Sequence, residues 1–171
     1  MSITSRAGRL AALALITLAP SLAAAHDFKA GDLVIQHPWA RATPNGAQVA
    51  GGYPTVVNHG TAADTLTGGS FDAAAKFEIH DMTTDGGVMR MRPAGPVEIP
   101  PGGSVTLSPS GSHIMFTGLK RGLKKGDDVA GTLTFAHAGT VPVRFEVEGI
   151  GAKEPTDTGH AGHSMPGMDM D

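Results

Sequence analysis

The feature that most restricts the fold is a series of short apolar runs between about residues 31 and 148, each ended by turn-forming residues. The clearest run is 141–148, in which apolar and polar residues alternate strictly. Such alternation indicates a strand with one buried face. Residues 129–136 alternate in the same way, and the short link 137–140 makes these two runs a hairpin.

The other runs also have strand character, and Pro54 lies inside one of them, which predicts an edge or interrupted strand there. No stretch repeats apolar residues with a helical period, and 24 Gly and 12 Pro disfavour long helices. We therefore predict one all-β domain, a sandwich or Greek-key barrel. The further strands are expected at 33–36, 48–58, 65–71, 75–82, 88–92, 97–99, 104–107 and 113–118.

Residues 1–25 have the layout of a secretory signal peptide. Two arginines come first, an apolar run follows at 10–19, and small residues at 21–25 supply the cleavage site. The apolar run is too short to span a bilayer. We expect cleavage after Ala25, with the two preceding alanines as alternative sites. The mature protein would then be periplasmic.

The composition excludes several classes of protein. The chain has no Cys, which rules out disulfide frameworks, thiol nucleophiles and thiolate metal sites. Beyond the signal segment, 11 Lys and Arg (13 less Arg6 and Arg9) face 16 Asp and Glu, a net charge of −5. A nucleic-acid partner is not expected from this balance. No later run is long enough to span a membrane, and we expect a monomer.

Histidine and methionine carry the candidate chemistry. In two of the runs, apolar residues alternate with a His and a Met: His80 and Met82 in one, His113 and Met115 in the other. Because successive strand side chains point to opposite faces, these four residues should lie on the face away from the core. They are therefore candidates for ligands rather than core residues.

The segment after His80 predicts a hairpin. An Asp-Gly pair at 85–86 is typical of a two-residue turn. With that pair as the loop, Met82 lies opposite Met89 and His80 lies opposite Met91, all on one face. The other face is mostly charged, so the hairpin should project from the rim of the sheet.

Two imidazoles and two thioethers form a soft donor set of low charge. Such a set suits Cu(I) and poorly suits Zn²⁺, Ca²⁺ or Mg²⁺. The remaining hairpin methionines, Met82 and Met89, are either auxiliary ligands or packing residues. The predicted Cu(I) site consists of His80, Met91, His113 and Met115.

The spacing of these four residues resembles a known signature. His80, ten residues, Met91, twenty-one residues and then His113-Ile114-Met115 is similar to the H-x10-M-x21-H-x-M pattern of the periplasmic copper chaperones called PCu(A)C. The resemblance extends over about 31–148. Its flanking segments are 37–41, 50–53, 78–80 and 122–127.

The resemblance implies a cupredoxin-like β-sandwich that holds Cu(I) at an exposed site made by His80, Met91, His113 and Met115. It also implies copper delivery for cytochrome c oxidase, to its copper-bearing subunit, through a Sco-type thiol protein, or both. Such a protein is not an enzyme. The copper-binding domain is expected to occupy residues 26–148.

Residues 149–171 have no strand periodicity and few apolar residues, so a flexible, disordered tail is expected. The tail is rich in His and Met and is a candidate for a second copper site. Imidazole with carboxylate or backbone would accept Cu(II), and the thioethers would accept Cu(I). The candidate ligands are His160, His163, Met165, Met168 and Met170.

Two alternatives to delivery remain at this stage. The first is copper sequestration without a specific recipient. The second is a copper oxygenase in which His26, as the mature N-terminus, chelates copper through its amino group and imidazole. The oxygenase alternative would need a substrate groove and a further His partner, which the sequence does not provide.

Overall fold

A computed structural model describes residues 27–156 as an 11-stranded sheet without a helix among them. The predicted signal peptide, His26 and the predicted copper ligands of the tail lie outside these residues. The described residues contain no helix that could cross a membrane. The strands are β1 (Phe28–Ala30), β2 (Leu33–Arg41), β3 (Val49–Asn58), β4 (Asp64–Phe71), β5 (Lys76–Asp85), β6 (Val88–Pro93), β7 (Val97–Ile99), β8 (Ser104–Thr106), β9 (His113–Thr117), β10 (Asp128–Phe135) and β11 (Gly139–Glu148).

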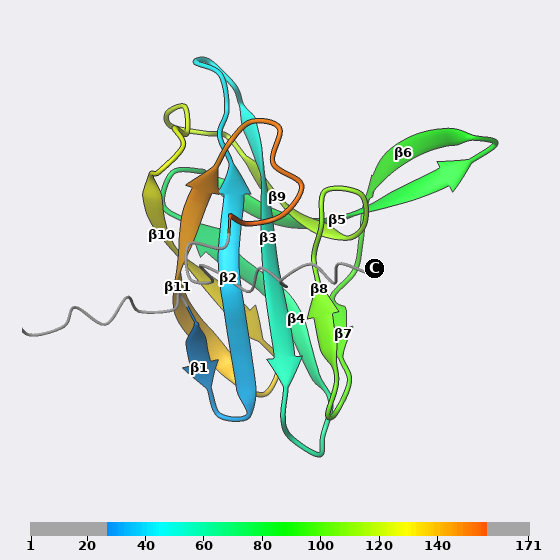
Figure 1. Cartoon of the computed structure of the whole chain (residues 1–171). Coiled ribbons are helices and arrows are strands. Elements are labelled where there is room, and N and C mark those ends of the chain that lie inside the picture. Colours follow the sequence, from blue (N-terminus) through cyan, green and yellow to red (C-terminus); the bar gives the residue numbers. More distant parts are fainter. Residues whose placement is uncertain (1–26, 157–171) are drawn as a thin grey trace, which may run out of the picture.

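The strands follow the order β6-β5-β9-β3-β2-β11-β10-β4-β7, with β1 paired to β2 and β8 paired to β3. Only the pairing of β11 with β2 is parallel among those described. In Figure 1 the sheet bends back on itself, so that β2, β3 and β11 form one layer and β4 and β10 lie behind them. The all-β sandwich prediction is confirmed.

The predicted strands are all present, and the sequence pattern missed β1, the extension of β2 to Arg41 and the extension of β5 to Asp85. One expectation needs partial correction: Pro54 does not lie in an edge strand, because β3 is central in the sheet. Pro54 lies where β3 changes partner from β9 to β8, opposite the register shift between Gln36 and Trp39 in β2. A missing N–H is tolerated at such an interruption.

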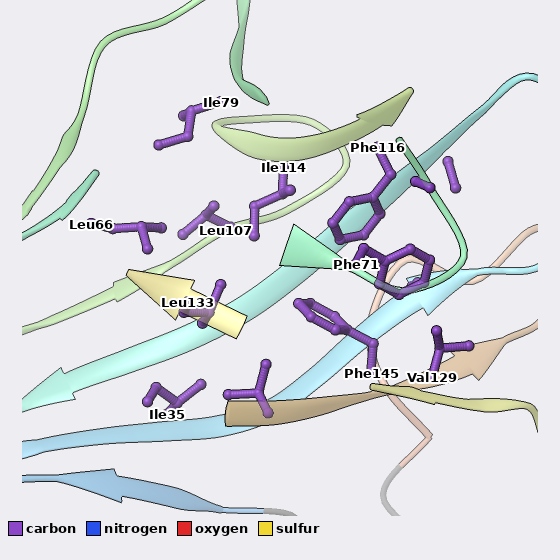
Figure 2. Packing of buried hydrophobic residues seen from close by; sticks show 14 of the residues in the cluster. Ile35, Leu66, Phe71, Ile79, Leu107, Ile114, Phe116, Val129, Leu133 and Phe145 are labelled. Atoms are coloured by element: carbon purple, nitrogen blue, oxygen red, sulfur yellow. The ribbon is translucent and has the colours of Figure 1, made fainter. Parts of the chain in front are cut away.

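The core lies between the two layers (Figure 2). Phe71 stacks on Phe116 with 4.0 Å between ring centroids, and Phe145 meets both rings edge-on at 5.4 Å. Burying one such side chain stabilises a fold by about 1.5–3 kcal/mol. Since Ile114 and Phe116 of β9 are directed into this core, their neighbours His113 and Met115 take the other face of the strand.

The described chain ends in a segment, 149–156, that folds back onto the domain. Arg41 donates to the carbonyl of Ala152 at 2.6 Å. The carboxylate of buried Glu148 accepts from the backbone N–H and the hydroxyl of Thr156, at 2.7 and 2.8 Å. The first part of the predicted flexible tail, residues 149–156, therefore contacts the folded domain. The sequence pattern missed these contacts because they depend on residues distant in the chain.

Candidate metal centre

The antiparallel ladder of β5 and β9 brings the two predicted histidine ligands together. His80 pairs directly with His113, and Glu78 pairs with Met115 on the same face. The imidazole centroids are 6.1 Å apart, with 43° between the ring planes. The alternation that directs Ile79 into the core therefore places both imidazoles side by side outside it.

The hairpin of β5 and β6 has a different register from the one predicted. Its two-residue loop is Gly86-Gly87, with φ of 58° and 81°, and not Asp85-Gly86. Both loop positions need positive φ, which glycine adopts without the steric cost that an aspartate side chain would add. The predicted hairpin turn was therefore wrong by one residue, and the paired positions by two.

The observed register determines which ligands are direct neighbours. Met82 lies opposite Met91, and His80 lies opposite Pro93, so that Met91 is diagonal to His80. A shift of two residues keeps every side chain on its predicted face. Diagonal residues are about 7–8 Å apart, a distance that long side chains can bridge. Met91 thus remains within reach of the paired imidazoles.

His80 has an unusual polar environment. Both of its ring nitrogens are buried and have no hydrogen-bond partner among the described residues. Glu78 Oε2 lies 3.4 Å from His80 Nε2, but the two groups are not aligned for a hydrogen bond. Buried polar atoms are nearly always paired, and leaving one unpaired costs about 1–3 kcal/mol. An imidazole in this state fits the requirement for a metal ligand.

His113 is held in one tautomer. Its side chain is buried, and Nδ1 lies 3.0 Å from the carbonyl oxygen of Gly111. Because a carbonyl only accepts, Nδ1 carries the proton and Nε2 keeps its lone pair. Hydrogen bonds of this kind orient histidines that bind metals.

The two thioethers complete a soft set that solvent can reach. Met115 is half-buried beside Glu78, and Met91 is 48 % exposed at the rim. Within residues 27–156, no three His, Cys, Asp or Glu side chains converge as a metal site. The arrangement therefore offers imidazole nitrogen and thioether sulfur rather than the oxygen-rich cage that hard cations require.

A row of aromatic rings supports the site from the side of β2 and β3. The Trp39 and Tyr53 rings lie 4.5 Å apart between centroids with their planes tilted by 41°, and the Tyr53 ring lies 6.3 Å from that of His113. Burial raises the pKa of the Tyr53 hydroxyl, and the nearby Arg41 guanidinium offsets part of that effect. A Cβ at Gly51 would collide with the Tyr53 phenol, so the glycine makes room for this ring.

Sequence reasoning missed the roles of Tyr53 and Glu78 beside the site. The alternation of β5 does place Glu78 on the face of His80. The contact of Tyr53 with His113, by contrast, has no local signal, because it depends on the pairing of β3 with β9.

Known proteins are similar to this chain in sequence. The model of the family described as "Putative lipoprotein LpqE-like" matches residues 33–147. A protein of Leifsonia xyli subsp. xyli described as "Putative lipoprotein Lxx21020" is 31 % identical over 137 residues, which cover 79 % of this chain and 81 % of the relative.

Solved structures are also similar. The copper-bound PCuAC domain from PmoF2 is 28 % identical, with a TM-score of 0.63 over 72 % of this chain and 98 % of that domain. Apo-DR1885 from Deinococcus radiodurans is 26 % identical, with a TM-score of 0.56 over 87 % and 97 %. Its Cu(I) form is 30 % identical, with a TM-score of 0.52 over 66 % and 75 %.

These similarities confirm the cupredoxin-like fold and the resemblance inferred from the four-residue spacing. Family match, fold and sequence identity agree over the segment that contains both histidines and both methionines. The chain belongs to the LpqE-like family, and its folded domain is similar to the solved PCuAC domains.

Proposed function

We propose that this protein is an exported copper chaperone that binds Cu(I) through His80, Met91, His113 and Met115. The observation that carries the proposal is the buried, unpartnered imidazole of His80 beside the oriented imidazole of His113. Support comes from relatives whose solved structures are described as copper-bound and Cu(I)-bound.

The donor set suits a cargo that must be released. Cu(I) favours thioether and imidazole ligands, and none of the four carries a charge when it binds. Two of the ligands lie deep, because His113 is 3 % exposed and the side chain of His80 is 13 % exposed. Met91 lies at the rim, so an incoming ligand would displace its thioether first.

This order of displacement favours delivery to a thiol-bearing or His/Met-bearing acceptor. A thiolate binds Cu(I) more tightly than a neutral thioether, so transfer to a Sco-type thiol protein would be favourable. Transfer to the copper-bearing subunit of cytochrome c oxidase is the direct alternative. We place both events in the periplasm, in keeping with the signal-like segment 1–25 and the lipoprotein description of the relatives.

Replacement of Met91 by Leu tests the site with little risk to the fold, because the side chain is exposed and Leu is of similar size. We expect Cu(I) affinity to fall by about tenfold or more, since the loss of outer-shell partners alone costs 10–100-fold at metal sites. Competition titration gives the affinity, and X-ray absorption should show one sulfur ligand fewer.

The matched control is Val88→Leu, which changes an exposed apolar residue on the same strand. Equal affinities of the two variants would reject the assigned site. Delivery is separated from sequestration in a strain that lacks the protein. Complementation by the native chain but not by Met91→Leu should restore oxidase activity under copper limitation, whereas an effect on copper tolerance alone would indicate sequestration.

A further inference from the structure

We propose a second Cu(I) site, an entry site formed by Met82, Met89 and Met91 on the hairpin of β5 and β6. This inference rests on the proposed function, because the entry site would pass its ion to the histidine-containing site. It also gives a role to two methionines that the first site does not use.

The register brings the three thioethers together. Met82 and Met91 are direct cross-strand partners, and Met89, two residues from Met91, is diagonal to Met82. Directly opposed Cβ atoms lie about 4.5–5.5 Å apart, and diagonal neighbours are within reach of long side chains. Three unbranched thioether side chains on one face can therefore converge on one ion.

Packing does not account for Met89 and Met91, although Met82 is half-buried. Every residue of β6 is exposed, with Met89 at 56 % and Met91 at 48 %. Figure 1 shows that β6 and the end of β5 extend away from the body of the domain. An exposed methionine stabilises a fold very little, because its apolar surface stays in water.

The chemistry of the cluster selects a soft ion. Thioether sulfur is a neutral, polarizable ligand that favours Cu(I) and offers little to Zn²⁺, Ca²⁺ or Mg²⁺. The basic side chains of Arg90 and Arg92 alternate with the methionines along β6 and therefore lie on the other face. The methionine face thus presents no charge of its own that would repel a monovalent cation.

Met91 links the two sites. Exposure falls along one face from Met89 at 56 % through Met91 at 48 % to His113 at 3 %. Transfer is a ligand exchange in which the Cu–S bonds to Met82 and Met89 break while Cu–N bonds to the imidazoles form. Copper remains Cu(I), Met91 stays bound throughout, and no electron is transferred.

The first test compares the full native chain with the double variant Met82→Leu/Met89→Leu. Both carry ¹³C-labelled methionine methyl groups, which the second measurement below also uses. We expect the double variant to keep its equilibrium affinity for the first Cu(I) within about threefold, and to take up Cu(I) from a chelator about tenfold more slowly. Val88→Leu is the control, because it changes the same hairpin without removing sulfur. Native uptake rates in the double variant would overturn the inference.

A second measurement observes the entry site directly. In His80→Leu, Ag(I), as a diamagnetic substitute for Cu(I), should shift the methyl resonances of Met82, Met89 and Met91 together. Unshifted hairpin resonances would overturn the inference. The proposed function is tested independently in the native chain. It would be contradicted if Ag(I) left the signals of Met115 and of the imidazoles unchanged.

Discussion

At the residue scale, one missing side chain shapes the wall of the metal centre. Gly51 lies on the same face as Met115, its cross-strand partner, and under the phenol of Tyr53. Tyr53 is 5 % exposed and is held between Trp39 and His113. Its ring therefore has little freedom to move away from a new methyl group.

Gly51→Ala should displace Tyr53 and, through it, the imidazole of His113. Overpacking of this kind lowers the free energy of unfolding by about 1–3 kcal/mol, and urea denaturation should measure a loss of this size. Cu(I) affinity should fall as well. Gly68→Ala is the matched control, because it also adds a methyl group within a strand but meets open space. Equal behaviour of the two variants would contradict the supporting role of Tyr53.

At the scale of the element, the β5–β6 hairpin is where turn chemistry determines ligand position. Residues 86 and 87 both have positive φ, and a Cβ at either position would meet no neighbouring atom. A side chain at either position would therefore be unfavourable only because of the left-handed backbone conformation, and not because of a steric clash with a neighbour. The hairpin projects from the sheet, so no core contact compensates for a weakened turn.

Gly86→Ala/Gly87→Ala should destabilise the hairpin by about 1–2 kcal/mol per residue, because a Cβ is unfavourable in left-handed backbone. We expect faster amide exchange in β6 and weaker Cu(I) binding, with unchanged exchange in the core strands. Gly95→Ala, which meets open space at a residue without positive φ, should leave exchange and binding unchanged. Native exchange in the double variant would show that the turn does not limit hairpin stability.

At the scale of the whole molecule, buried Asp64 ties the start of β4 to the turn between β10 and β11. Its carboxylate accepts from the N–H groups of Thr65 at 2.7 Å, and of His137 and Ala138 at 2.9 Å. Burial raises the pKa of Asp64, but these three donors together lower it by more, so the pKa lies below its usual value. Ionised Asp64 therefore stabilises the folded state.

The contribution of Asp64 should be complete above its unfolded-state pKa of about 3.9, and lost as the pH falls through the lower folded-state value. At pH 7, Asp64→Asn should lower the free energy of unfolding, measured by urea denaturation, by about 1–3 kcal/mol. The amide nitrogen of Asn replaces one acceptor oxygen and leaves an N–H donor of the turn without a partner. The difference from the native protein should shrink in acid. Asp72→Asn, at an exposed carboxylate, should change stability by less than about 0.5 kcal/mol at either pH.

Local sequence patterning predicts the fold class, most strand positions and the strand face of His80, Met91, His113 and Met115. These properties follow from alternation with a period of two, which is local and survives a register error of two residues, as the hairpin shows. The pairing of His80 with His113, the pairing of Met82 with Met91 and the packing of residues 149–156 on the domain emerge only from the folded chain. Those contacts depend on which strands pair and on backbone conformation at the turn, and neither is encoded in the alternation of a single strand.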